Sequence, residues 1–382
     1  MYNAKDLKEN PIFKESRKEA NPMIFYYKGY YYKKIGDENK AITAFNKGAM
    51  LSPDYVFPGR LESFDVLGAV IKNNPHDWKA HYYLGNLLTA KFRWEDGLNA
   101  YRKADKINSS YSVLHRNIAQ ILWNKKKDIE GAISEYEKAI KAAPFDHHLY
   151  VDLDYLYSLK GLNKKRINLL KNAPLSVRVN FNVILQESIL NVHLEDYDKA
   201  INILKENKFH PWEGWTDAHD SWVLASIGKG LLLLEKENYT EALTYFKASM
   251  DYPENLGTGK PHKIIDPRAH YLMGLCYEKL GNKEKAIELW EKARMEEVPI
   301  ESEEVYYRAL ALKKIDEKSK AGKLLTNLID IGSKRSDSKA LYLSGLGYSG
   351  MGMVKEAEKL FKKALDAEPN LIEAKWQLNS TN

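Results

Sequence analysis

The chain has 382 residues, of which 44% are hydrophobic and 29% are charged, a balance typical of a soluble, folded protein. Its 58 basic and 52 acidic residues leave a net charge of +6, which is small for this length and gives no indication of a nucleic-acid partner. The single cysteine, Cys276, excludes an internal disulfide framework and favours a cytoplasmic location, and no apolar run approaches the roughly 20 residues that a membrane-spanning helix needs.

A regular spacing of small residues follows the N-terminal lead-in. Residues 1–21 are charged and interrupted by proline, without the apolar core of a signal peptide. Over residues 22–369, two small residues recur at a constant separation, and an aromatic residue follows the second of them one helical turn later. The clearest copies are Gly29/Ala41/Phe45, Gly85/Gly97/Tyr101, Gly230/Ala242/Phe246, Gly274/Ala286/Trp290 and Gly345/Ala357/Phe361.

This spacing is typical of stacked helical hairpins. Two antiparallel helices can cross closely only where small residues meet, and the large residues fill the gap to the next hairpin. The pairs Gly36–Asp37 and Gly281–Asn282 place a helix-ending glycine before a helix-capping side chain. The pattern resembles the tetratricopeptide (TPR) repeat, in which W-x2-L-G-x2-Y, A-x3-F and P follow over about 34 residues. We therefore predict an all-α fold, a right-handed superhelical solenoid of about nine to ten TPR-type hairpins, closed by a solvated capping helix at 370–382.

Three inserted segments interrupt the repeats, at 54–77, 209–222 and 252–267, and one extra residue lies near 125–127. The first contains a degenerate helical stretch. The other two connect neighbouring repeats, so we expect them to lie close together at one edge of the solenoid. Insertions in a solenoid map to loops on one face, which is often the binding face.

The segment 209–222 contains three of the chain's eight tryptophans among carboxylates and histidines. Such a set suits a sugar ring or a protein partner, and a carboxylate pair about 5–10 Å apart could hydrolyse a glycosidic bond. Equally, the tryptophans could plug an irregular junction while the polar groups cap helices. The carboxylates considered for hydrolysis are Glu213, Asp217, Asp220 and Glu254. The candidate binding residues of the two long insertions are His210, Trp212, Glu213, Trp215, His219, Tyr252, Glu254, Asn255 and Lys260.

A second candidate surface is the inward face of the first helices of the early repeats. It is rich in aromatic and amide side chains, which suits a peptide or a glycan. Its residues are Tyr82, Asn86, Arg116, Asn117, Gln120, Trp123, Tyr150, Asp154 and Tyr157. Asn86 and Asn117 match the TPR clamp that grips chaperone C-termini, but Tyr82, His147 and Val151 replace its basic residues. Chaperone tails are therefore not expected.

Other motifs carry no prediction of a cofactor or metal. The glycines of GLGYSG (345–350) follow no strand, so a dinucleotide site is excluded. GTGK (257–260) lacks the remainder of a phosphate loop, and Cys276 is interpreted as a small buried residue. His147 and His148 occupy consecutive helical positions, which we expect to point in different directions.

Several stretches together resemble a more specific family: PDYVFPGRLE (53–62), HYYLGNLL (81–88), FHPWEG (209–214) and YPENLGTGKP (252–261). They are similar, over roughly residues 50–300, to the TPR half of bacterial proteins of unknown function that carry an N-terminal β-sandwich resembling sugar mutarotases. The resemblance implies a carbohydrate setting, although this chain contains no β-sandwich and is either a stand-alone relative or a C-terminal piece. Our leading hypothesis is a non-catalytic TPR scaffold that binds a protein partner, such as a sugar-processing domain. The alternative is direct glycan binding or glycoside hydrolysis through 209–222 and 252–267.

Overall fold

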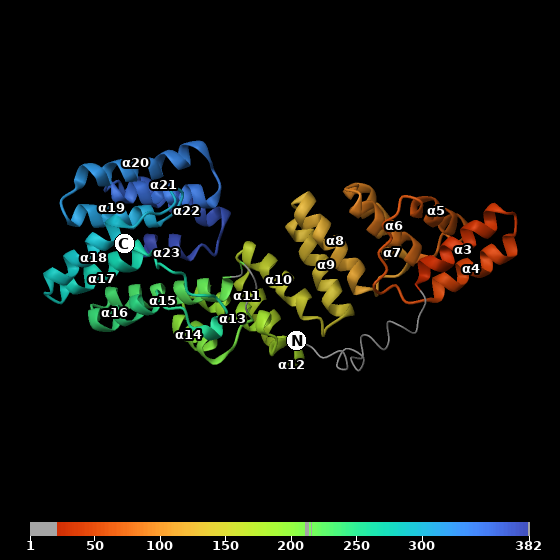
Figure 1. The fold of residues 1–382 in the computed structure, drawn as a ribbon, viewed down its shortest axis with the longest axis horizontal. Coiled ribbons are helices and arrows are strands. Elements are labelled where there is room, and N and C mark those ends of the chain that lie inside the picture. The colour runs from red at the N-terminus through yellow and green to blue at the C-terminus, as the bar shows by residue number, and fades with distance from the viewer. Residues whose placement is uncertain (1–20, 211–213, 215, 381–382) are drawn as a thin grey trace. The chain divides into compact units, whose positions relative to one another are not determined.

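The computed structural model describes residues 21–210, 214 and 216–380, and this part of the chain is all α-helical (Figure 1). It contains twenty-one α-helices, one π-helical turn and one 3-10 turn, and no strand occurs within the described ranges. None of the described helices is both long enough and apolar enough to cross a membrane. The prediction of an all-α array of TPR-type hairpins is confirmed.

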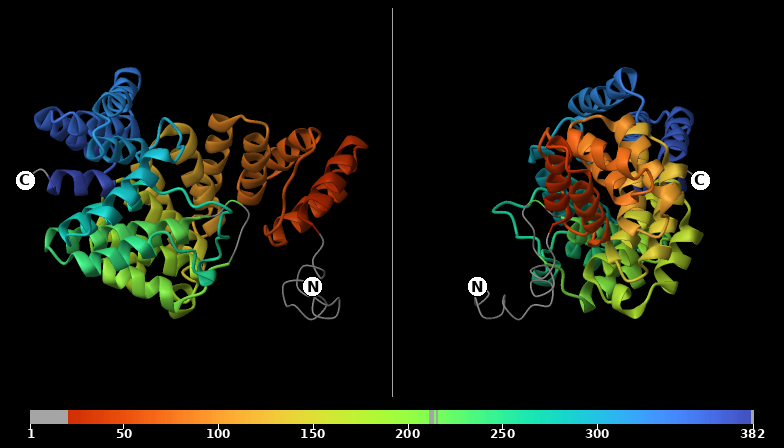
Figure 2. Two further views of the ribbon diagram at one scale, coloured as in Figure 1. Left: turned by 60° about the vertical axis from the view of Figure 1, so that its left-hand side comes forward. Right: turned by 90° about the vertical axis from the view of Figure 1, so that its right-hand side faces the viewer.

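The chain divides into two compact units, one ending at Leu149 and the other beginning at Tyr150. Within each unit, successive helices pair as hairpins that stack on one another (Figure 2). The helices of the first unit are α3 (Pro22–Lys34), α4 (Glu38–Met50), α5 (Ser63–Asn73), α6 (Trp78–Ala90), α7 (Trp94–Ile107), α8 (Ser112–Ile121), η1 (Leu122–Lys126) and α9 (Ile129–Ala142).

The boundary between the units falls within α10 (His147–Leu159), and the remaining helices belong to the second unit. They are α11 (Asn163–Asn172), α12 (Leu175–Arg178), α13 (Phe181–His193), α14 (Tyr197–Glu206), α15 (Asp217–Glu235), α16 (Tyr239–Ala248), η2 (Glu254–Leu256), α17 (Pro267–Lys279), α18 (Lys283–Met295), α19 (Glu304–Lys314), α20 (Lys318–Lys334), α21 (Ser338–Gly350), α22 (Val354–Ala367) and α23 (Ile372–Asn379).

The first glycine of each clear copy of the repeat frame lies against the aromatic residue of the same hairpin. A Cβ atom added to Gly85 would lie 2.4 Å from the ring of Tyr101, and one added to Gly345 would lie 2.6 Å from the ring of Phe361. The same close approach joins Gly29 to Phe45, Gly230 to Phe246 and Gly274 to Trp290. The helices can therefore approach until backbone and ring are in contact, which buries the aromatic residue completely or nearly so.

The turns inside the hairpins have the predicted chemistry. Gly36 and Gly281 adopt left-handed backbone angles, with φ of 84° and 81°. Directly after them, Asp37 and Asn282 accept hydrogen bonds from the first turn of the following helix. These side chains satisfy backbone N–H groups that the helix itself leaves unpaired.

The extra residue near 125–127 is absorbed as a π-helical turn at the end of α8. The turn η1 carries five residues, and the amide of Asp128 donates to the carbonyl of Leu122 at 2.9 Å. Lys127 then takes a left-handed angle, φ 58°, and ends the helix. A single inserted residue thus widens one turn instead of shifting the following helix out of register.

The C-terminal helix α23 packs into the core of the second unit. Ile372 and Trp376 are buried, and the Trp376 indole donates to the Tyr197 hydroxyl at 2.7 Å. Just before the helix, the Asn370 amide donates to the carbonyl of Ser158 at 2.8 Å. We predicted a solvated cap, but this helix is part of the core of the second unit. Its hydrogen bond to Tyr197 joins residues about 180 positions apart in the chain.

We expect Gly345→Val to destabilise the second unit by about 1–3 kcal/mol, since the new side chain overlaps the Phe361 ring. Gly322→Ala is the matched control, because a Cβ there meets nothing within 4 Å inside α20. This control should gain up to about 1 kcal/mol from higher helix propensity. Urea unfolding of both variants checks the prediction, and equal effects of the two changes would contradict it.

Candidate binding pocket

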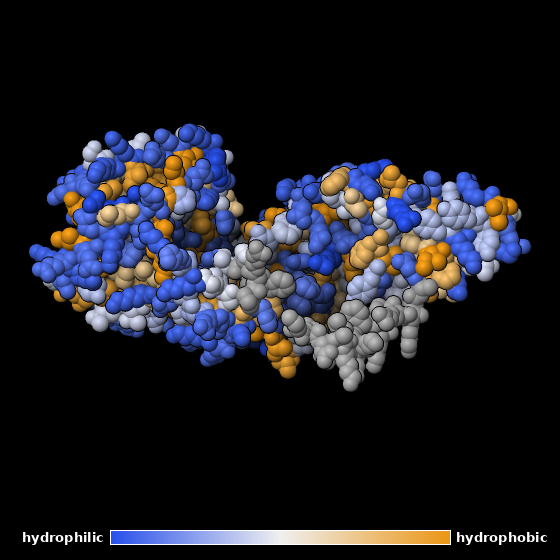
Figure 3. Space-filling view, viewed as in Figure 1, coloured by the Kyte–Doolittle hydropathy of each residue, from blue (hydrophilic) through white to orange (hydrophobic). Residues whose placement is uncertain are grey.

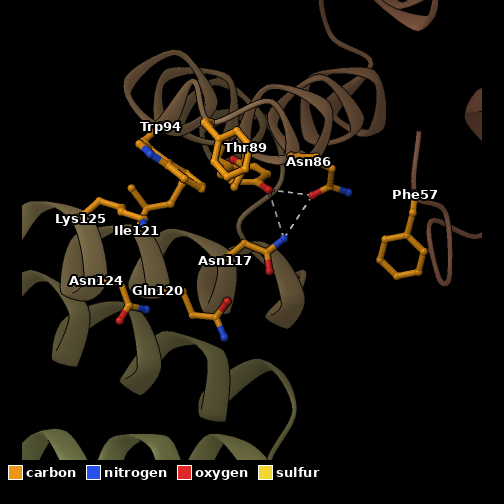
Figure 4. Close-up of a pocket in the computed structure, with 12 residues that line it drawn as sticks. Phe57, Asn86, Thr89, Trp94, Asn117, Gln120, Ile121, Asn124 and Lys125 are labelled. Carbon is orange, nitrogen blue, oxygen red and sulfur yellow. Dashed lines mark hydrogen bonds between the residues drawn. The ribbon is translucent and has the colours of Figure 1, made fainter. Parts of the chain in front are cut away.

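The first unit contains a pocket of about 450 Å³ between the α6–α7 hairpin and α8 (Figure 4). We call it the amide pocket. Its lining residues are Phe57, Asn86, Thr89, Ala90, Phe92, Trp94, Tyr101, Asn117, Gln120, Ile121, Asn124 and Lys125. Two of the predicted binding residues, Asn86 and Asn117, are therefore brought together, along with Gln120 of the same predicted surface.

A row of amide side chains follows one face of α8 into η1. Asn117, Gln120 and Asn124 are spaced by three and four positions, so they share one side of the helix. Asn117 donates to the side-chain oxygen of Asn86 at 3.2 Å, and the Tyr101 hydroxyl donates to the same oxygen at 2.7 Å. Gln120 and Asn124 make no hydrogen bond to the other residues drawn in Figure 4, nor to any other residue in the described ranges. The pocket thus contains fixed amides beside amides that are free to bind.

Aromatic side chains stand at the two ends of this row. Phe57 and Phe92 are each 78% exposed, although both are large and apolar. Phe92 lies edge-on to the half-buried Trp94, with ring centres 5.6 Å apart. The Lys125 ammonium lies 4.4 Å from the centre of the Trp94 ring, and Lys125 is the one charged residue among those that line the pocket. Figure 4 shows Phe57 on the opposite side of the amides from Trp94.

Tyr82 supports the pocket from the core. It is 3% exposed and packs against Trp78, Tyr101 and Tyr111, with ring centres 5.3–6.4 Å apart. Burial raises the pKa of its phenol. The prediction that Tyr82 is a surface-binding residue is wrong, because stacking of the repeats covers this position. Arg116 and Trp123 are half-buried and do not line the pocket.

A buried charged cluster fixes α8 to its partner helix. His115 Nδ1 lies 2.8 Å from the Glu135 carboxylate, which also accepts from Arg102 at 2.5 Å and Lys138 at 3.0 Å. Burial opposes ionisation of Glu135, but hydrogen bonds from these three residues prevail and lower its pKa to about 2. Burial likewise opposes protonation of His115, yet the hydrogen bond to Glu135 raises its pKa overall.

The second unit buries Tyr150 and Asp154, which were predicted to bind a ligand. Both Asp154 oxygens accept from Arg166, at 3.0 and 2.9 Å, and neither side chain is exposed. Arg166 also donates to His193 Nδ1 at 2.8 Å. Burial and the adjacent Arg166 charge lower the pKa of His193 to about 3, so this imidazole is neutral and accepts the bond. Asp154 therefore serves a buried ion pair, which contradicts its prediction as a binding residue.

The two long insertions meet, as their positions suggested. The amide of Phe209 donates to the carbonyl of Asn255 at 2.7 Å, and the Asn255 side chain donates to the carbonyls of Leu204 and Asn207. His219 stacks on Tyr252 with ring centres 4.0 Å apart. Asn255, His219 and Tyr252 thus hold the two segments together. Trp212, Glu213 and Trp215 lie outside the described residues.

Two of the described carboxylates of these insertions belong to a helix. Asp217 and Asp220 lie in the first turn of α15, where negative charge stabilises a helix. Residues 217–222 are therefore helical and not a loop, and the Trp222 indole donates to the carbonyl of Ala248 at 2.7 Å. Of the three tryptophans of 209–222, the described one, Trp222, is buried at a junction between helices, and the role of the segment stays a prediction.

The remaining residues of these insertions are less constrained. His210 is exposed and lies edge-on to Phe181, with ring centres 4.9 Å apart. Glu254 begins the 3-10 turn η2, and Lys260 is exposed. The binding roles predicted for these three residues stay predictions.

The His147–His148 pair differs from expectation. The two rings are 4.0 Å apart and do not diverge, and one ligand atom from each lies within 4.8 Å of an Asp146 oxygen. The pair opens α10, where Asp146 accepts from the His148 amide at 3.1 Å and holds the first turn. Our expectation of divergent side chains was wrong because it assumed regular mid-helix geometry.

Several lining residues of the amide pocket escaped the sequence analysis: Phe57, Phe92, Trp94, Asn124 and Lys125. Two signals could have indicated them. The extra residue near 125–127 marks the π-helical turn that carries Asn124 and Lys125. Phe92 stands at a turn position where four copies of the repeat have glycine, at Gly36, Gly161, Gly281 and Gly352.

We expect Asp154→Ala to lower the free energy of unfolding by about 3–5 kcal/mol, because it leaves the Arg166 charge buried without its partner. Asp198→Ala is the control, since it removes an ion pair with Lys229 in which the Asp198 side chain is 62% exposed. The control should cost less than about 1 kcal/mol. Chemical denaturation measures both free energies of unfolding. A small effect of Asp154→Ala would contradict a structural role of the Asp154–Arg166 ion pair.

The His115–Glu135 pair predicts a pH dependence of stability. Because folding raises the His115 pKa, its stabilisation is fully present below the unfolded pKa and is lost as pH rises through the folded one. His115→Gln should therefore cost more at about pH 5.5 than at about pH 8.5. Unfolding curves of both proteins at the two pH values test this. A cost that does not change with pH would show that folding leaves the His115 pKa unshifted.

Comparison with known proteins identifies the repeat unit. Models of the tetratricopeptide repeat match residues 267–296, and also 24–55, 117–146 and 338–371. Similar solved structures include YrrB, a TPR protein with an unusual peptide-binding site, at 19% identity over 59% of this chain and 89% of that one, with a TM-score of 0.27. MamA has 15% identity over 78% of this chain and 94% of that one, with a TM-score of 0.26.

A TPR protein from Parabacteroides merdae has 14% identity over 94% of this chain and 98% of that one, with a TM-score of 0.29. Scores this low carry no argument about function or partners. The repeat matches and the hairpin packing together show that this chain carries tetratricopeptide repeats within an all-helical array.

Proposed function

We propose that the chain is a non-catalytic scaffold that binds a protein partner, and that the amide pocket holds an extended segment of that partner. The observation that carries this proposal is the pair of free amides, Gln120 and Asn124, which continue the row begun by Asn117. Gln120 is half-buried and Asn124 is exposed, so each can exchange water for a hydrogen bond to a ligand.

An extended peptide has the chemistry that this row can recognise. Its main chain presents N–H donors and C=O acceptors in alternation, and each carboxamide side chain offers both complementary groups. A row of amides spaced along one helix face can therefore bind the backbone whatever the partner's side chains are. Among the described lining residues Lys125 alone is charged, which agrees with a neutral main chain as the ligand.

The lining offers little for catalysis. The described residues around the pocket include no carboxylate, histidine or cysteine. The described lining therefore lacks the carboxylate pair that glycoside hydrolysis uses for general acid–base catalysis.

The glycan alternative has less support than the protein partner. Carboxylates that could bond to sugar hydroxyls are missing from the described lining, and Asp217 and Asp220 lie at a helix end. A sugar-processing domain as the partner rests on the resemblance of FHPWEG and YPENLGTGKP alone, and it stays part of the proposal.

The test uses linear peptides selected from a random display library on the full chain. We expect the double variant Gln120→Ala/Asn124→Ala to bind the selected peptides about tenfold more weakly, since two hydrogen bonds of about 0.5–1.5 kcal/mol are lost. Asn99→Ala is the control, because Asn99 is exposed on α7 and does not line the pocket. Fluorescence anisotropy gives the affinities. Unchanged binding by the double variant would place the peptide elsewhere, and a library without any binder would contradict the proposal.

A further inference from the structure

The turn between α6 and α7 differs from every other hairpin turn in the described chain. Each turn contains one residue with left-handed backbone angles, and Phe92 is the one aromatic residue among them. The set is Gly36, Phe92, Lys127, Gly161, Glu195, Glu237, Gly281, Asp316 and Gly352. Glycine adopts this conformation without cost, whereas a bulky side chain is strained there.

Packing within the unit does not offset this strain. Phe92 has φ 61° and leaves 78% of its surface exposed, so the core gains almost nothing from its ring. Its ring contact is with Trp94, which lines the same pocket. Backbone strain of this kind concentrates at ligand-binding positions. A strained and exposed aromatic residue beside a pocket therefore indicates a role in binding.

Phe57, at the other end of the amide row, is a second large apolar side chain that is exposed beside the pocket. It is 78% exposed while its neighbour Val56 is 3% exposed, so the loop is held with Phe57 outward. The Tyr111 hydroxyl donates to Asp54 at 2.9 Å and ties this loop to α8. The amide pocket therefore has an apolar surface at each end and polar groups between them (Figure 4).

Apolar patches are otherwise scattered over the face shown in Figure 3, where hydrophilic residues predominate. The two phenylalanines that line the amide pocket are each largely exposed, so both ends of the pocket offer apolar surface to a ligand.

We infer that the amide pocket selects partner segments with a large apolar side chain, which packs against Phe92 and Trp94 while the partner's main chain follows the amides toward Phe57. This inference rests on the proposed function and specifies the partner's chemistry. A basic side chain is disfavoured at the Trp94 end, because Lys125 already lies over that ring.

The variant Phe92→Gly separates binding from folding. Glycine accepts the left-handed angle, so the melting temperature should stay the same or rise. Peptides selected on the full chain should bind this variant at least about tenfold more weakly. Glu237→Gly is the matched control: Glu237 has the same backbone angle, φ 61°, in the turn between α15 and α16, far along the chain from the pocket residues. The control should keep its affinity unchanged.

The peptide supplies the second half of the experiment. The selected sequences should share a Phe, Tyr, Trp, Leu, Ile or Met, and alanine at that position should weaken binding as much as Phe92→Gly does. Combining both changes should add little, because the two groups contact each other in the complex. Isothermal titration of the four combinations measures this coupling.

Four other results would overturn the inference. Peptides that depend on Gln120 and Asn124 but not on Phe92 would leave the proposed function standing and remove only the apolar selection. Selected peptides rich in Lys or Arg at the sensitive position would do the same. Absence of any peptide binder, or saturable binding of oligosaccharides lost in Phe92→Gly, would remove both proposals.

Discussion

The close crossing of two helices inside each hairpin is the constraint on which the rest of the structure depends. Inside a hairpin, the aromatic ring of one helix packs against a glycine of the other. This contact does not cover all the apolar surface of the hairpin, so the remainder packs against the next hairpin. The contacts of Gly85 with Tyr101 and of Gly274 with Trp290 show how little space is left. Because the hairpins repeat this packing, each one is positioned by its neighbour within the same unit.

The amide pocket arises where that regularity is altered locally. The π-helical turn η1 adds one residue to α8 and places Asn124 and Lys125 beside the pocket. At the facing turn, Phe92 replaces the glycine or charged residue that the other hairpins use. Neither change disturbs the stacking, because both occur at the end of a helix pair. A solenoid can therefore acquire a binding surface at its turns while its helix crossings stay intact.

Buried polar clusters hold these elements at defined positions. The Glu135 carboxylate of α9 accepts from His115 of α8, Arg102 of α7 and Lys138 of α9, so one group joins α9 to α7 and α8, which both line the pocket. In the second unit, Arg166 joins Asp154 to His193 in the same way. Such charges are expensive to bury alone, and their full pairing makes them rigid links. The C-terminal helix adds a different link, since Trp376 binds Tyr197 and closes the second unit on itself.

The sequence by itself determined the helical hairpins, because the glycine and aromatic spacing and the turn chemistry at Gly36 and Gly281 depend on local geometry alone. It also indicated Asn86, Asn117 and Gln120 correctly as neighbours of one surface, since helix periodicity places them on one side of consecutive hairpins. Burial was decided only by the tertiary structure: Tyr82 and Asp154 have the residue types of a binding surface, but neighbouring helices cover one and Arg166 neutralises the other. The exposure of Phe57 and Phe92 was likewise beyond the sequence, because an apolar residue is expected in the core unless the backbone at its position holds it outside.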